Sequence, residues 1–186
     1  MLESISLRNN TQITDKLFKV LAGLKRLHSL RIRNCKKITS LGLASFLDSV
    51  ALYRRNLTKF SLQMSVEQSV SDTFFDSLAK VKTITTLELA TFIVHGNALG
   101  NTIERLIALE NIVLCNVDLG GITDILLKLS KLLCLKSVEL YRVTGVEKDA
   151  VVALASKSIS LDTITLRKCG VHLDFTSVYP YHIRVL

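Results

Sequence analysis

The sequence predicts an α/β solenoid, in which short parallel strands line a concave face and helices return along a convex face. Three observations predict it. Apolar residues recur in triplets, spaced by three and then by two positions, at seven places along the 186 residues. The triplets begin 25 to 30 residues apart. Between them, apolar residues recur at helical spacing. Because one such unit cannot bury its apolar edge alone, neighbouring units are expected to stack around a shared core.

The stretch from Leu27 to Thr39 contains the pattern in full. Leu27, Leu30 and Ile32 form the triplet, and Cys35 follows three positions later, which gives L-x-x-L-x-L-x-x-N/C. The spacing of two puts the last two triplet members on one face of a strand, and the Cys or Asn position marks a turn. The seven triplets begin at Leu2, Leu27, Leu57, Ile84, Leu109, Leu135 and Leu161.

Residues 1–186 therefore predict one domain of about seven repeats. Near the end, Ile183 and Leu186 are spaced like the first two members of an eighth triplet. The ends of a solenoid need polar caps to stay soluble, and neither end shows one. We therefore expect a fragment of a longer solenoid, or a chain capped by a partner.

The returns between the triplets are predicted to be helices. In the first return, Leu17, Val20, Leu21 and Leu24 recur at helical spacing, and Thr14 is the expected N-cap. The fourth return carries Ile103, Leu106 and Ile107 as apolar residues. The other predicted helices run over about Thr39 to Tyr53, from Val70-Ser71-Asp72 through Leu78, from Ile122-Thr123-Asp124 onward, and over about Glu147 to Ala155.

Composition excludes several classes of protein. Apolar residues make up 48 % of the chain, which is too many for a disordered protein. No run reaches the roughly 18 apolar residues of a membrane-spanning helix, and the N-terminal residues do not resemble a signal peptide. The four cysteines form no C-x-x-C pair. We therefore expect an intracellular protein, in the cytoplasm, the nucleus or an organelle, without membrane attachment.

The net charge of +8 is concentrated at one end of the chain. Residues 1–60 hold 12 Lys and Arg against three acidic residues, whereas residues 61–186 hold 12 against 13. Positive charge concentrated at one end of the chain suggests that an acidic partner or nucleic acid binds at that end. A solubilising surface without a ligand explains the same distribution.

No pattern in the sequence indicates catalysis. The four histidines lie far apart, and none forms H-E-x-x-H or pairs with a cysteine at the spacing of zinc ligands. No phosphate-binding G-x-x-x-x-G-K-[ST] motif occurs. We expect a non-enzymatic protein with no catalytic residues, metal, cofactor or small-molecule substrate.

The repeat pattern resembles that of the leucine-rich-repeat proteins. Cys35-Lys36-Lys37-Ile38-Thr39, the two Ile-Thr-Asp helix openings and the stretch Leu161 to Cys169 are similar to the cysteine-containing repeats of the ribonuclease-inhibitor-like class. The resemblance covers about Leu2 to Leu173 and implies the curved horseshoe. Some proteins of this class are F-box substrate receptors, although no F-box is present. The chain departs from the pattern where Cys or Asn is expected, at Ser65, Phe92, Val117 and Val143.

The strand residues between the triplet members are expected to face solvent on the concave side. Neighbouring strands lie about 4.8 Å apart, so equivalent residues form continuous stripes. One group is the expected protein-binding centre, where an aromatic and small apolar residues stand beside charges, as in an interface core. Its members are Glu88, Ala90, Val113, Cys115, Glu139, Tyr141 and Arg167. A second group is expected to contact an acidic partner or nucleic acid: Arg8, His28, Arg31, Arg33 and Lys59.

The expected function is that of a protein–protein interaction scaffold that binds a partner on the concave sheet. One alternative is a structural component of a ribonucleoprotein that uses the basic N-terminal end on RNA phosphates. The sheet, however, lacks the stacked aromatics that single-stranded RNA favours. A further alternative, implied by the resemblance, is the substrate-recognition subunit of a ubiquitin ligase. The strand residues of the concave face could also have no ligand at all.

Overall fold

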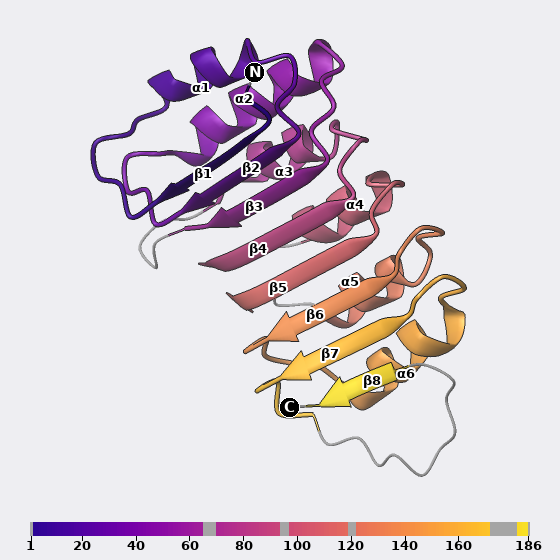
Figure 1. The fold of residues 1–186 in the computed structure, drawn as a ribbon. Coiled ribbons are helices and arrows are strands. Elements are labelled where there is room, and N and C mark those ends of the chain that lie inside the picture. The colour runs from indigo at the N-terminus through magenta and orange to yellow at the C-terminus, as the bar shows by residue number, and fades with distance from the viewer. Residues whose placement is uncertain (1, 65–69, 94–96, 119–121, 172–181, 186) are drawn as a thin grey trace.

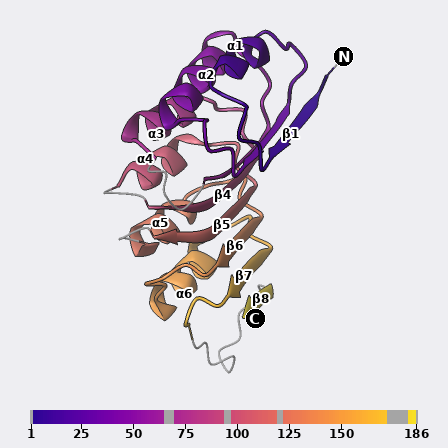
Figure 2. The same ribbon diagram turned by 90° about the vertical axis from the view of Figure 1, so that its left-hand side faces the viewer.

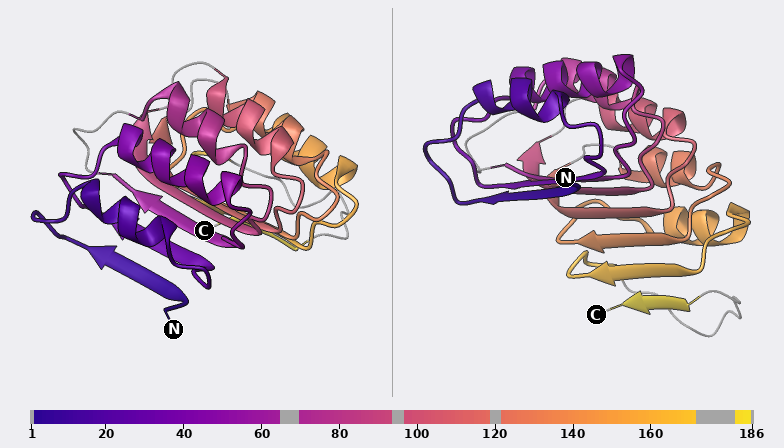
Figure 3. Two further views of the ribbon diagram at one scale, coloured as in Figure 1. Left: turned by 90° about the horizontal axis from the view of Figure 1, so that it is seen from above. Right: turned by 45° about the horizontal axis from the view of Figure 1, so that its top comes forward.

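The chain folds into one parallel sheet with helices on a single face, as the computed structural model shows (Figures 1 and 2). The structure describes residues 2–64, 70–93, 97–118, 122–171 and 182–185. Strand and helix alternate up to the seventh strand, and the sheet order follows the chain order from β1 to β8. Seen from above, the helices form a layer behind the sheet (Figure 3). This arrangement confirms the predicted α/β repeat solenoid, which is similar to a leucine-rich-repeat fold.

The strands are short and the helices are of two to four turns. The strands are β1 (Ser4–Arg8), β2 (Ser29–Arg33), β3 (Lys59–Gln63), β4 (Thr86–Ile93), β5 (Asn111–Asp118), β6 (Ser137–Tyr141), β7 (Thr163–Arg167) and β8 (His182–Val185). The helices are α1 (Lys16–Ala22), α2 (Ser40–Leu52), α3 (Asp72–Leu78), α4 (Ala98–Arg105), α5 (Ile122–Leu129) and α6 (Lys148–Lys157). Among the described residues, no helix is long and apolar enough to cross a membrane.

The strand register is the one that the triplets predict. Leu30 pairs with Phe60, which in turn pairs with Leu87, and this in-step alignment continues through β7. Just before the strands, backbone carbonyls continue the alignment. The carbonyl of Thr85, for example, accepts from the N–H groups of Glu110 and Asn111 at 2.8 and 2.9 Å. Backbone hydrogen bonds therefore link each repeat to the next independently of the side chains.

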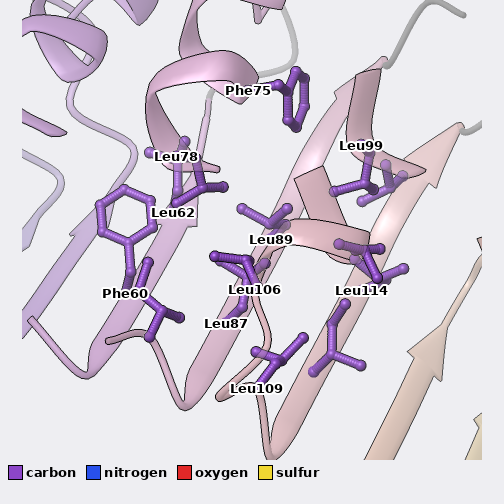
Figure 4. Packing of buried hydrophobic residues seen from close by; sticks show 14 of the residues in the cluster. Phe60, Leu62, Phe75, Leu78, Leu87, Leu89, Leu99, Leu106, Leu109 and Leu114 are labelled. Atoms are coloured by element: carbon purple, nitrogen blue, oxygen red, sulfur yellow. The ribbon is translucent and has the colours of Figure 1, made fainter. Parts of the chain in front are cut away.

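The core lies between the sheet and the helices, where the triplets meet the apolar faces of the helices (Figure 4). Leu87, Leu89 and Leu114 are fully buried in it. Aromatic rings fill the core in the N-terminal half. Phe74 lies 6.2 Å from Phe60 and 5.2 Å from Phe75, measured between ring centroids. All the buried phenylalanines of the described core lie in this half, whereas aliphatic side chains fill the later repeats.

The Cys or Asn position of the pattern lies at a turn and is buried or half-buried. The Cys35 thiol lies 3.5 Å from the Arg33 carbonyl, and the Cys169 thiol lies 3.4 Å from the Leu140 carbonyl. Val117 and Val143, which depart from the pattern, are as buried as Cys35. The site therefore accepts a small apolar side chain as well as a thiol. Ser65 lies outside the described residues, as does the side chain of Phe92.

The residue before the turn position adopts left-handed backbone in six of the seven repeats. This is the region with φ near +50 to +60° that asparagine tolerates better than most residues. Side chains at this position also pair across repeats, since Asn34 Nδ2 donates to Asn9 Oδ1 at 3.0 Å. The residues with positive φ at this position are Asn9, Asn34, Thr91, Asn116, Arg142 and Lys168.

Several predicted details of the helices and the N-terminus were wrong. The N-cap of α1 is Asp15 rather than Thr14. Ile107 was assigned to an apolar helical return, yet it is 65 % exposed because α4 ends at Arg105 and the chain turns back to the sheet. Leu2 opens the first triplet but is 52 % exposed, since no described repeat precedes it. The helix boundaries predicted for α2, α3 and α6 agree with the structure to within two residues.

An eighth strand is present, but its predicted register was wrong. β8 pairs in parallel with β7, and Ile183 lies opposite Ile164. Ile183 is therefore the second member of its triplet and Val185 the third. The prediction had made Ile183 the first member and Leu186 the second. Leu186 lies outside the described residues.

Candidate protein-binding face of the sheet

The helix-free side of the sheet, here called the open face, corresponds to the predicted concave face. The register arranges its residues in rows that run across the strands. One row holds Ser6, Arg31, Ser61, Glu88, Val113, Glu139 and Thr165, and the neighbouring row holds Arg8, Arg33, Gln63, Ala90, Cys115, Tyr141 and Arg167. Both rows are those that the sequence predicts, because aligning the triplets of neighbouring strands also aligns the residues between the triplet members.

Half-buried apolar residues occupy the centre of the open face. Ala90, Cys115 and Tyr141 lie side by side on β4, β5 and β6, and Val113 precedes Cys115 by two positions on the same face. The guanidinium of Arg142 lies 5.1 Å from the centroid of the Tyr141 ring. A cation at this distance is attracted by the ring face. The centre thus presents a positioned aromatic ring next to small side chains.

Cys115 is a poor candidate for a nucleophile. Burial raises the pKa of its thiol above the ordinary value, while the charges of Arg142 and Arg33 partly oppose that effect. A thiol is reactive as the thiolate, and here the neutral form is favoured. Cys115 therefore adds a small apolar contact to the centre.

Glu88 joins the basic end of the open face to its centre. Its carboxylate accepts hydrogen bonds from Arg31 Nη2 at 3.1 Å and from Ser61 Oγ at 2.7 Å, and it lies 3.6 Å from Arg33 Nη2. Arg31 stands on β2 and Glu88 on β4, so the bridge crosses β3. The small Ser61 side chain between them leaves room for it. Two of the five residues predicted to bind an acidic ligand are therefore already paired with a carboxylate.

The other predicted basic residues are dispersed. Arg8 and Lys59 are exposed and form no ion pair with another described residue. His28 lies in the loop before β2 and belongs to neither row. Its backbone carbonyl accepts from the N–H groups of Thr58 and Lys59, both at 2.9 Å. The structure thus places Arg8 and Lys59 on either side of β2 without joining them to Arg31 or Arg33.

The two remaining residues of the predicted centre lie at its C-terminal side. Glu139 and Arg167 are both exposed, on β6 and β7 respectively. Arg167 pairs in register with Tyr141, and Glu139 precedes Tyr141 by two residues on the same face. Charges therefore border the apolar centre on both sides, with Glu88 on one side and Glu139 and Arg167 on the other.

Sequence reasoning missed two residues of this face. Ser61 was not predicted as a contact residue, although its hydroxyl donates to the Glu88 carboxylate from the strand between Arg31 and Glu88. Arg142 was not singled out. Its place directly after Tyr141, at a position of left-handed backbone, was the available signal.

Within the described ranges, no group of three or more His, Cys, Asp or Glu residues could hold a metal ion. No protein-family model matches the chain, and no curated protein matches it.

Proposed function

We propose that this protein is a non-enzymatic interaction scaffold that binds a protein partner across the open face, as a cysteine-containing leucine-rich-repeat protein would. The observation that carries the proposal is the register of β4, β5 and β6. It brings Ala90, Cys115 and Tyr141 into one apolar row bordered by charges. Interface cores combine an aromatic anchor with small apolar residues inside a polar rim.

The uncovered sheet gives a second argument. All-parallel sheets are usually covered on both faces, whereas this one has helices on one face only. Its open face also has ordered charges, because Glu88 holds Arg31 in place. A partner would meet a partly preorganised surface and lose less side-chain entropy on binding.

A second candidate function is RNA binding at the basic end, and the exposure of Arg8 and Lys59 favours it. Phosphates could pair with both residues without breaking an existing ion pair. The pairing of Arg31 and Arg33 with Glu88 weakens this candidate, since RNA would have to displace a carboxylate. The protein-binding function therefore has the stronger support.

The experiment compares capture of partners from native lysate by three forms of the full chain, with and without nuclease. Tyr141→Ala removes the aromatic anchor. Tyr53→Ala is the matched control, because Tyr53 is 60 % exposed at the end of α2 and carries its own stacked arginine, Arg55, at 5.5 Å.

If the proposal holds, a partner is still captured after nuclease treatment. That partner binds the Tyr53→Ala control as well as it binds the unaltered protein. Tyr141→Ala should weaken its binding by about 1–3 kcal/mol, as loss of an interface anchor does. Equal capture by both variants would contradict the open-face proposal. Loss of every partner on nuclease treatment would favour RNA.

A further inference from the structure

One position of the repeat changes its chemistry halfway along the solenoid. It is the residue two places before each triplet, where the chain returns from the helices to the sheet. In three successive repeats this residue is basic, and in the next three it is a large aliphatic. The residues in order are Lys25, Arg55, Lys82, Ile107, Leu133 and Ile159.

The three aliphatic residues, here called the aliphatic edge, are far more exposed than the core. Ile107 is 65 % exposed, Leu133 is 70 % exposed and Ile159 is 78 % exposed. Consecutive repeats place equivalent residues side by side, so these side chains form one stripe. Single exposed aliphatic residues are ordinary, but a continuous apolar patch marks an interaction site.

A groove between the ends of α5 and α6 adjoins the aliphatic edge. It has a volume of about 520 Å³, and Leu127, Leu133 and Ile159 contribute its apolar wall. Volumes of this order are typical of ligand-binding clefts. The groove therefore extends the stripe into a concave apolar surface.

The charges around the groove are mainly positive. Three lysines and one aspartate line it, which leaves an excess of two positive charges. Lys128 is paired with Asp124 at 3.0 Å, and Lys131 approaches Glu104 at 3.6 Å. Lys157 is exposed and forms no ion pair with any described residue. An occupant with carboxylates beside its apolar residues would complement this rim.

We infer that the aliphatic edge and this groove bind an acidic segment of another protein that carries large apolar side chains. A second copy docked groove to groove is a poor occupant, because it would bring lysines against lysines. Electrostatic complementarity with an acidic segment would instead speed association and fix its orientation. The site uses none of the open-face residues, so mutation separates the two.

The test measures binding of the full chain to a labelled peptide of alternating Leu and Glu, by fluorescence anisotropy. A peptide of alternating Leu and Lys serves as the charge control. The combined variant Ile107→Ser, Leu133→Ser and Ile159→Ser removes the aliphatic edge without touching the core. Leu52→Ser is the matched control, since Leu52 is 75 % exposed at the end of α2 and lies outside the edge.

We expect the Leu/Glu peptide to bind, and the triple variant to bind it at least about tenfold more weakly, as loss of interface anchors does. The Leu52→Ser control should bind it normally. The double variant Lys131→Glu and Lys157→Glu should prefer the Leu/Lys peptide. Circular dichroism verifies that each variant is folded.

Four results would overturn the inference. The Leu/Glu peptide binds the triple variant as well as the unaltered chain, or it binds neither. The two peptides could bind the unaltered chain equally. Light scattering could also show a dimer that Leu133→Ser dissociates, which would make a second copy the occupant.

Discussion

The carboxylate of Asp15 accepts two hydrogen bonds from Thr39 of the next repeat, one from the backbone N–H at 2.9 Å and one from the hydroxyl at 2.7 Å. The Thr39 hydroxyl in turn accepts from the N–H of Gly42 at 3.0 Å, which caps α2. Asp15 thus orients the capping residue of the following helix. A Cβ on Gly42 would overlap the Asp15 carboxyl group, so the link requires glycine there.

Gly42→Ala is therefore expected to destabilise the protein although it lies in a helix. Alanine ordinarily stabilises a helix interior by about 1 kcal/mol relative to glycine. Here the methyl group must displace Asp15 and its two hydrogen bonds, which are worth about 1 kcal/mol each. In an Asp15→Ala background the same Gly42→Ala change should become stabilising. Urea denaturation of the four proteins measures this reversal, and a destabilising effect in both backgrounds would contradict the link.

Leu114→Asp should unfold the central repeats. Leu114 is fully buried between β5 and the helices, and a carboxylate there would lack a partner. The expected loss of stability exceeds about 4 kcal/mol. Val113→Asp is the matched control, because Val113 is the preceding residue and faces the open side. It should cost about 1 kcal/mol, the range of strand propensities. Thermal midpoints compare the two variants, and an unchanged midpoint for Leu114→Asp would show that the register is wrong.

The basic end predicts a salt-dependent response if it contacts RNA. Replacing Arg8, Arg31 and Arg33 by Ala should reduce the log–log slope of RNA affinity against salt by about 2–3, since each phosphate contact contributes about 0.7–0.9. The control removes the same charge elsewhere, at the exposed Lys19, Arg26 and Arg54. Titration of a total-RNA pool gives the slopes. No binding at low salt, or equal slopes for both triple variants, would eliminate the RNA function.

Glu88→Gln separates the structural role of the central bridge from its role in recognition. The bridge is partly exposed, with the Glu88 side chain 27 % accessible, so its loss should cost at most about 1 kcal/mol of stability. The difference in stability between Glu88→Gln and the unaltered protein should shrink at high salt, because screening weakens the ion pair of the unaltered protein. If RNA binds at this end, freeing Arg31 and Arg33 should increase its affinity. Stability curves at two salt concentrations and the same RNA titration measure both effects.

Cys115 should need a higher pH for alkylation than an ordinary thiol does. Burial raises its pKa, so the thiolate forms at a higher pH than on an exposed cysteine. Arg142→Ala should move the alkylation curve to still higher pH, because the Arg142 charge lowers this pKa. Mass spectrometry of iodoacetamide-treated protein across pH follows each cysteine, with the exposed Cys134 as the internal reference. Faster labelling of Cys115 than of Cys134 at neutral pH would contradict the prediction.

The amino-acid sequence by itself determined the repeat, the direction of the strands and the rows of the open face. These depend on local spacing. Once Leu30 and Ile32 must both face the core, Arg31 must face the other way, and in-step triplets then align Ala90 with Cys115 and Tyr141. The boundaries of α2 were also predictable from local sequence, because the capping residue Thr39 comes directly before the helix and its apolar residues.

Only the tertiary structure decided how the charged side chains pair and which apolar residues stay outside. The bridge from Arg31 to Glu88 spans 57 positions of sequence and depends on the small Ser61 between two strands. The Asp15 side chain makes no capping hydrogen bond in α1 and instead accepts a hydrogen bond from Thr39. Ile107 is apolar in sequence but lies where α4 has already ended. Such outcomes depend on side-chain reach and on where each helix stops against its neighbours, and neither is a property of local spacing.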